Sequence, residues 1–326
     1  ASVRRHIGCR VSVGRYTPCL FYCDIPAPPW VSFPRMNGPT PELDPGSAAT
    51  RTVSGASGQW EQLVGGMTRI PALLREFGVD AGVLLARAGL PADALDHPAK
   101  RAPFSALARV VNDAVRETGC AHFGLLVGAR YGWADVGPPG ELALASATVR
   151  EALETFTVYH RLNSQGGAAY FKRYDDTAEV GFAIFHPQVE TLASAYDLAV
   201  ASLVSGMRQL CGPGWHPTSV LLPRTGPVDE RAYRAHFRCP VQFDADRAAF
   251  CFDAAALSQP LATADRSRKR ALEAGMAMGL RDELRVRLYR ALRLLLLDGT
   301  VGASFLAQHF SMHQRTLQRH LKAHGI

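Results

Sequence analysis

The chain has 326 residues, of which 47% are hydrophobic and 20% charged, a balance typical of a soluble globular protein long enough for two domains. It contains no run of about 18 apolar residues, which argues against a membrane-spanning helix. The net charge of +7 is carried by the two ends of the chain. Residues 1–57 hold 6 basic against 3 acidic residues, residues 58–263 hold 18 against 21, and residues 264–326 hold 12 against 5. This distribution predicts a nucleic-acid-binding tail on a nearly neutral body, the alternative being a solvated arginine-rich helix.

Residues 1–57 are rich in Pro, Gly, Ser and Thr, with seven prolines between Pro26 and Pro45. Neither helical nor strand periodicity survives that density of proline, so we predict a disordered leader. The numbered chain begins at Ala1 instead of Met. We therefore interpret it as a fragment or as including an upstream region.

Residues 58–263 are predicted to form an α+β sensor domain, with helices and a small antiparallel sheet. Helical spacing of apolar residues predicts helices over residues 67–77, 81–88, 149–162 and 191–210 and one that begins at Pro103. Alternation predicts a hairpin of residues 168–174 and 178–185 and short strands at 219–222, 241–243 and 249–252. Residues 137–140, Gly-Pro-Pro-Gly, are predicted to be a loop.

The sequence offers no support for an enzyme or for a metal site. It lacks the motifs GxSxG and HExxH and any glycine-rich phosphate loop. Its seven cysteines lack paired spacing and form no CxxC. We therefore predict a cytoplasmic, non-enzymatic protein with reduced thiols, no metal, no cofactor and no membrane partner.

From Ala264 onward the pattern is helical, and the last residues predict a helix-turn-helix. A short helix at residues 303–310 is followed by a turn at Ser311-Met312 and by a second helix at about residues 313–324. The small residue Ala307 allows the second helix to cross closely at Leu317. The structural alternative is an ordinary amphipathic helix pair in a core.

The exposed face of the second helix carries side chains suited to a DNA groove: Gln314, Arg315, Thr316, Gln318, Arg319 and Lys322. We expect Arg315 and Gln318 to contact base edges, with Gln314 as a third candidate. Arg319 and Lys322 are expected to contact phosphates, and Thr316 could do either. Leu306, Ala307, Leu317 and Leu321 are predicted to be structural.

At this segment the sequence resembles the first helix-turn-helix of AraC/XylS-type transcription regulators. Further motifs resemble the arabinose-binding-type sensor domain of that family: Gly89-Leu90-Pro91, Phe123-Gly124-Leu125, Gly140-Glu141-Leu142, and the stretch from Tyr233 to Phe243. The resemblance covers about residues 60–326. It implies that the N-terminal domain binds a small effector and that the C-terminal domain reads operator DNA.

Three features depart from the family pattern. Ser311 stands where the turn usually has Gly, and His313 replaces the usual capping Ser, so Ser311 and Gln314 could form a capping box instead. The chain also stops at Ile326, before the second helix-turn-helix of the family. We interpret it as truncated within the DNA-binding domain. The alternative is an effector-binding or dimerisation module with little DNA binding of its own.

The sequence does not identify the effector. Tyr159, His160 and Arg161 at a helix end, or Tyr170 and Tyr174 on the hairpin, are candidates for lining a pocket, although such residues are more often surface residues. A homodimer formed through the sensor domain would raise DNA affinity by avidity.

Overall fold

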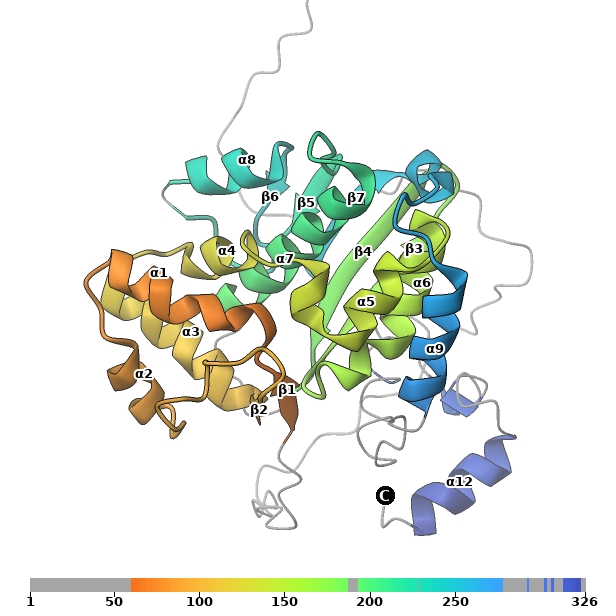
Figure 1. Cartoon of the computed structure of the whole chain (residues 1–326), viewed down its shortest axis with the longest axis horizontal. Helices are drawn as coiled ribbons and strands as arrows, with labels where there is room; N and C mark the ends of the chain where they lie inside the picture. Colours follow the sequence, from red (N-terminus) through yellow and green to blue (C-terminus); the bar gives the residue numbers. More distant parts are fainter. Residues whose placement is uncertain are drawn as a thin grey trace, which may run out of the picture. The chain divides into compact units, whose positions relative to one another are not determined.

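The computed structural model describes residues 60–186, 193–227, 229–277, 292, 302–303, 306–307 and 313–323. The predicted leader, residues 1–57, lies outside the described residues, as do the turn Ser311-Met312 and most of the helix predicted at residues 303–310. The N-terminal part of the described chain is mainly helical (Figure 1). Its elements are β1 (Glu61–Leu63), η1 (Gly65–Arg69), α1 (Ile70–Glu76), α2 (Ala81–Arg87), β2 (Arg101–Pro103), α3 (Phe104–Thr118) and α4 (Phe123–Gly128).

Local sequence sets the ends of these helices. The side chain of Asp80 accepts a hydrogen bond from the backbone N–H of Gly82 and so caps α2. Helix α3 starts directly after Pro103 and ends at Gly119, whose φ of 65° is left-handed. The apolar faces of α1 to α4 pack together in one hydrophobic cluster, which includes Phe123.

A second group of helices follows: η2 (Trp133–Val136), α5 (Pro138–Leu144), α6 (Val149–Tyr159) and η3 (His160–Leu162). The prediction of a loop at residues 137–140 is wrong. Pro138 and Pro139 occupy the first turn of α5, where a missing N–H costs no intrahelical hydrogen bond, and Gly137 supplies the φ of 70° before it.

Five strands form one sheet in the order β3-β4-β7-β5-β6: β3 (Gly167–Arg173), β4 (Thr177–Ile184), β5 (Ser219–Leu221), β6 (Val241–Gln242) and β7 (Ala248–Asp253). The predicted hairpin is confirmed, with Val180 of β4 opposite Phe171 of β3 and Phe250 of β7. The expectation of a purely antiparallel sheet is wrong for one pair. Strand β6 runs parallel to β5 because α8 (Arg231–Phe237) returns the chain to the same end of the sheet.

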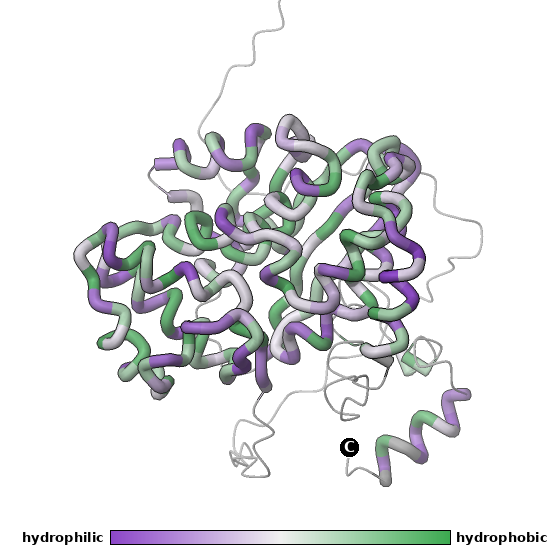
Figure 2. Tube along the Cα trace, in the orientation of Figure 1, coloured by the Kyte–Doolittle hydropathy of each residue, from purple (hydrophilic) through white to green (hydrophobic). Residues whose placement is uncertain are grey.

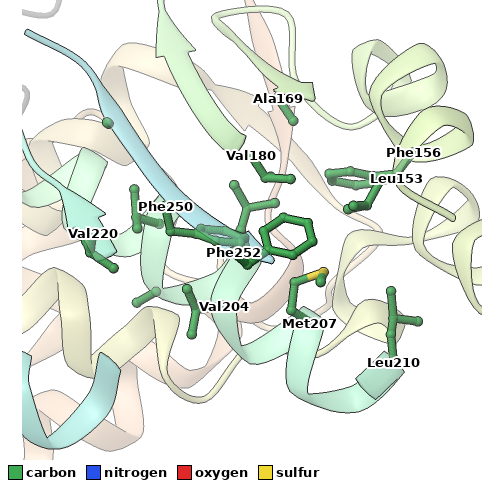
Figure 3. Packing of buried hydrophobic residues seen from close by; sticks show 14 of the residues in the cluster. Leu153, Phe156, Ala169, Val180, Val204, Met207, Leu210, Val220, Phe250 and Phe252 are labelled. Atoms are coloured by element: carbon green, nitrogen blue, oxygen red, sulfur yellow. The ribbon is translucent and has the colours of Figure 1, made fainter. Parts of the chain in front are cut away.

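The remaining described elements are α7 (Ala193–Cys211), η4 (Ala254–Ser258), α9 (Arg266–Ala277) and α12 (Gln314–Ala323). Side chains of α6, α7, β4 and β7 meet in the main core, where Figure 3 shows Phe156, Val180, Met207 and Phe252 turned toward one another. Helix α7 also packs closely on α4. A Cβ on Gly124 would overlap the carbonyl oxygen of Ser194, so only glycine fits there.

The described chain is thus a mixed domain of helices around a sheet, as predicted. The α-helical DNA-binding segment stays a prediction, as does the domain boundary between residues 263 and 264. Helix α9 lies after that boundary in sequence, yet Arg268 on α9 forms an ion pair with Glu141 on α5, with an N–O distance of 3.0 Å. The first helix after the boundary is therefore attached to α5, in the domain that precedes the boundary.

His236 on α8 gives stability a dependence on pH. Burial, helped by the charges of Arg208 and Arg238, lowers the pKa of His236 to about 4. Because the pKa is lower in the folded state than the unfolded value of 6.5, the contribution of the neutral imidazole to folding stability is complete above pH 6.5. It is lost as the pH falls toward 4. We expect a loss of about 2 kcal/mol in the free energy of unfolding over that interval, allowing for the partial exposure of the ring. Urea titrations at several pH values should show a shallower acid slope in His236→Gln, and an unchanged slope would contradict the assignment.

Candidate functional site

An apolar cavity of about 70 Å³ lies among β1, η2, α6, η3, β4 and α7. Most of its lining is contributed by α7 and by the segment around η2. The residues that line it are Gln62, Leu63, Tyr131, Gly132, Trp133, Val136, Phe156, His160, Asn163, Phe182, Leu198, Ala199, Ser202, Leu203 and Gly206. A concave, largely apolar site with a few polar groups is the usual form of a small-molecule binding site.

One wall of this first cavity is a chain of aromatic rings packed edge to face. The ring of Trp133 lies 4.9 Å from that of Phe156, which lies 5.2 Å from the imidazole of His160. The imidazole in turn lies 5.4 Å from Phe182. These separations and tilts are the favoured geometry of aromatic pairs, so the wall is pre-formed.

Trp133 is fixed to helix α7 by its polar atoms. Its indole Nε1 donates to the carbonyl of Gly206 at 2.8 Å, and its backbone N–H donates to Oε1 of Gln209 at 2.9 Å. A Cβ on Gly206 would approach the indole to 3.0 Å, so a larger residue would displace it. Trp133 is therefore held as a rigid part of the cavity wall.

Two amides, beside the polar side chains of Tyr131, His160 and Ser202, contribute to the polar part of the lining. Asn163 donates from Nδ2 to the carbonyl of Val136 at 3.3 Å, and Gln62 accepts at Oε1 from the hydroxyl of Ser164 at 3.1 Å. The phenol of Tyr131 donates to the carbonyl of Val64 at 3.4 Å, and burial raises the pKa of Tyr131 well above its usual value. Tyr131 is therefore a neutral phenol at physiological pH.

A second cavity, of about 60 Å³, adjoins the first. Gln62, Phe182, Leu198 and Ala199 line both cavities, and the rest of the second lining is apolar. Its other lining residues are Met67, Phe104, Leu107, Ala108, Val111, Ile184 and Ala195. The two cavities thus lie on either side of a shared set of residues from β1, β4 and α7.

Of the five residues that the sequence suggested for a pocket, only His160 lines either of these two cavities. Tyr170 is buried, but its hydroxyl donates to Glu179 at 3.0 Å, and Tyr174 is 52% exposed. Sequence reasoning missed Trp133, Phe156 and Phe182. Each is an ordinary apolar residue in its own segment, and only the fold brings them together.

Two buried carboxylates lie outside the cavities, and each has an arginine partner. Asp197 on α7 is fully buried and accepts from Arg224 at 2.5 Å and from the hydroxyl of Tyr233 at 2.7 Å. Glu179 on β4 is paired with Arg247 at 2.9 Å. Both pairs join distant parts of the chain, which gives them a structural role.

Helix α9 is attached to α6 as well as to α5. Lys269 forms an ion pair with Glu151, and its Nζ also donates to the hydroxyl of Thr155 at 3.4 Å. The Lys269 side chain is only 13% exposed, so this contact is more protected than an ordinary surface pair. The hydrogen bond from Lys269 lowers the pKa of Glu151.

The predicted DNA-contacting residues lie on or beside the exposed face of α12. Gln314, Arg315, Gln318, Arg319 and Lys322 are exposed, and Thr316 is half-buried. In contrast, the side chains of Leu306, Ala307 and Leu317 are 6%, 3% and 1% exposed, whereas Leu321 is half-buried. Figure 2 shows hydrophilic and hydrophobic residues alternating along α12, as expected for a helix with one buried face.

His313 occupies the capping position at the start of α12. Its Nδ1 accepts from the backbone N–H of Arg315 at 3.3 Å, and its carbonyl accepts from the N–H of Leu317 at 3.1 Å. The imidazole thus caps the helix, a role in which Ser, Thr, Asp or Asn is more usual. The alternative cap by Ser311 lies outside the described residues.

The described residues include four cysteines, Cys120, Cys211, Cys239 and Cys251, all with free thiols. Burial raises the pKa of Cys211 and that of Cys239 to about 11, so neither is a reactive thiolate near neutral pH. Within the described part of the chain, no group of three or more His, Cys, Asp or Glu side chains could hold a metal ion. Among the same residues, no helix has the length and hydropathy needed to cross a membrane.

Comparison with known proteins identifies proteins that are similar to this chain and a family to which it belongs. The HTH-type transcriptional regulator VirS of Mycobacterium tuberculosis is 27% identical over 262 residues, which cover 78% of this chain and 76% of VirS. The crystal structure of the transcriptional regulator CdpR from Pseudomonas aeruginosa matches 75% of this chain and 78% of its own, with 21% identity and a TM-score of 0.43. The family described as the arabinose-binding domain of AraC transcription regulators, N-terminal, matches residues 78–261, which is more than half of the chain. The chain therefore belongs to the AraC-type regulators that carry this arabinose-binding domain.

Proposed function

We propose that this protein is a transcription regulator that binds a small effector in the first cavity and reads operator DNA with α12. The observation that carries the proposal is the pairing of a pre-formed apolar cavity with a separate, exposed polar helix face. Family membership supports it, and the relative VirS is named as an HTH-type transcriptional regulator. Residues 58–263 would form the sensor and residues 264–326 the DNA-binding part. The predicted homodimer remains a prediction.

On α12, the proposed contacts divide by chemistry. Arg315 and Gln318 would donate to base edges, with Gln314 as a third reader, because forked donors match the acceptors of the major groove. Arg319 and Lys322 would contact phosphates, and Thr316 could contact either. The buried Leu317 would fix the angle at which this face is presented.

The fold offers a path from the cavity toward the DNA-binding part. Trp133 and Val136 of η2 line the first cavity. Helix α5 packs directly on η2, as shown by Gly140, on which a Cβ would overlap the carbonyl oxygen of Trp133. Glu141 on α5 is paired with Arg268 on α9. A ligand that shifts η2 would therefore move α5 and α9, and α9 leads in sequence to the DNA-binding part.

The test is a gel shift of the full chain on the DNA upstream of its own gene, at two salt concentrations. Since phosphate contacts release counterions, the proposal expects a shift that weakens steeply with salt. The alternative, an effector-binding or dimerisation module with little DNA binding of its own, expects no shift even at low salt.

Arg315→Ala is expected to cost about 1–3 kcal/mol of DNA-binding free energy and to relax specificity at one base pair. Lys322→Ala should instead weaken all sequences equally and reduce the salt slope by about one. Arg231→Ala is the matched control, because Arg231 on α8 is a 90% exposed arginine of the sensor domain and should leave DNA binding unchanged. Equal affinity of Arg315→Ala for all operator variants, at the wild-type level, would refute the assignment.

Lys269→Ala is expected to weaken the coupling between effector binding in the first cavity and DNA binding by α12. The substitution removes the ion pair with Glu151 and so detaches α9 from α6. We expect an effector that changes the DNA affinity of the wild type to change that of the variant at least about threefold less, which is within the usual size of allosteric coupling. Arg270→Ala, an exposed arginine on the same helix, should retain full coupling. The measurement is DNA-binding anisotropy with and without effector. Wild-type coupling in Lys269→Ala would show that the contact between α9 and α6 does not carry the signal.

A further inference from the structure

The chemistry of the first cavity limits what can bind there. Among the described residues that line it or the second cavity there is no Asp, Glu, Lys or Arg. A charged group placed against this lining would lose hydration without gaining a carboxylate, ammonium or guanidinium partner, which is unfavourable. The imidazole of His160 also lines the cavity but is packed between Phe156 and Phe182. The lining therefore disfavours carboxylates, phosphates and amines as ligands.

The polar side chains of the lining are few, namely Gln62, Tyr131, His160, Asn163 and Ser202, and most are engaged with the protein. The Ser202 hydroxyl donates to the carbonyl of Ala199 at 2.8 Å, and the Tyr131 hydroxyl donates to that of Val64. The amides of Asn163 and Gln62 keep spare hydrogen-bonding capacity, since each amide can form about four hydrogen bonds. That capacity suits one or two polar groups on a ligand, and it is too little for a sugar, whose hydroxyl groups each need a partner.

The second cavity extends this apolar space. Beyond the shared residues, which include Phe182 and Ala199, it reaches Leu107 and Val111 on α3. Among the described residues that line the second cavity, Gln62 is the only one with a polar side chain, and it also lines the first cavity. An elongated ligand with its polar end at Gln62 and Asn163 would therefore place its apolar end in the second cavity.

We infer that the effector is an uncharged, mainly apolar molecule with a single hydrogen-bonding end, and not a sugar. This inference rests on the proposed function, which makes the first cavity the effector site. The polar end lies at Asn163 and Gln62, the middle packs on the aromatic wall of Trp133, Phe156 and Phe182, and the tail enters the second cavity.

Four probes of known chemistry test the inference by calorimetry on the full chain: 2-phenylethanol, 4-phenyl-1-butanol, phenylacetate and L-arabinose. We expect 2-phenylethanol to bind with a Kd of about 1 mM or tighter. The two more methylene groups of 4-phenyl-1-butanol lie between its hydroxyl and its ring and carry the ring into the second cavity, so this alcohol should bind about tenfold tighter. Phenylacetate and L-arabinose should bind at least about tenfold more weakly than 2-phenylethanol.

Variants test which cavity each alcohol occupies. Ser202→Leu fills the first cavity and should abolish binding of both alcohols, whereas Ala108→Leu fills only the second cavity and should remove the advantage of the longer one. Ala86→Leu adds the same side chain at an exposed position and should change neither. Should either buried variant fail to fold, the four probes on the wild type still decide the ligand class.

Binding of phenylacetate or L-arabinose as tight as that of 2-phenylethanol would overturn the inference, and so would no binding by any of the four probes. Binding of the alcohols without any change in the gel shift would leave the ligand class standing. It would count instead against the proposed regulatory function, so the two failures are distinguishable.

Discussion

Replacing Asp197 by alanine is expected to lower the free energy of unfolding by about 3–5 kcal/mol. The carboxylate is fully buried on α7 and joins Arg224 and Tyr233, from two other segments. Its removal leaves Arg224, whose side chain is only 12% exposed, without this charge partner. An unpaired buried charge costs far more than the pair itself contributes.

A double variant separates the cost of leaving Arg224 unpaired from the net contribution of the ion pair. Asp197→Leu combined with Arg224→Met replaces the pair with apolar groups and should recover most of the loss, measured by urea titration. A loss below about 1 kcal/mol in Asp197→Ala would show that the pair behaves like an exposed one.

The pH dependence gives a second check on this pair. Burial raises the pKa of Asp197 to about 6, although Arg224 and Tyr233 oppose the shift. Because the folded-state pKa is raised, the associated stabilisation is complete below about pH 3.8 and is lost as the pH rises through 6. The stability difference between the wild type and Asp197→Ala should therefore grow as the pH falls from 6 toward 4, the direction opposite to that expected for His236.

Gly124→Ala is expected to cost about 3 kcal/mol, because the added Cβ would overlap the backbone carbonyl of Ser194 on α7. Backbone cannot move aside as a side chain can, so α4 and α7 would have to separate. The matched control is Gly275→Ala on α9, where nothing lies within 4 Å of the new Cβ. Both glycines are helical, so the control should gain about 0.5–1 kcal/mol from lower backbone entropy. The measurement is urea titration of both variants. If both substitutions change the free energy of unfolding in the same direction, the close packing of α4 on α7 is contradicted.

Much of the fold could be predicted from the sequence where local signals agree. The helix at α6 combines an apolar period with a Thr148 cap, and the β3–β4 hairpin combines alternation with a short polar turn. Local reasoning failed where one residue type serves two purposes. Pro138 and Pro139 were predicted to interrupt structure, yet proline is equally suited to the first turn of a helix.

The candidate sites differ in how far sequence could identify them. The face of α12 follows from the spacing within one helix, so Arg315 and Gln318 were assigned together. The first cavity takes its wall from η2, α6 and β4, and nothing in the local sequence of Trp133 or Phe182 indicates that they meet. The capping role of His313 was also missed, because an imidazole is an uncommon cap and its geometry is needed to recognise it.

The absence of Asp, Glu, Lys and Arg from the described lining of the first cavity bears on the source of the proposed effector. The uncharged effector proposed above has no ionic group to desolvate, and the same property would let it partition into lipid. Compounds of this kind diffuse through a bilayer without a carrier. A regulator built around this cavity would therefore respond to the concentration of its signal on both sides of a membrane, with no uptake system between the source and the sensor.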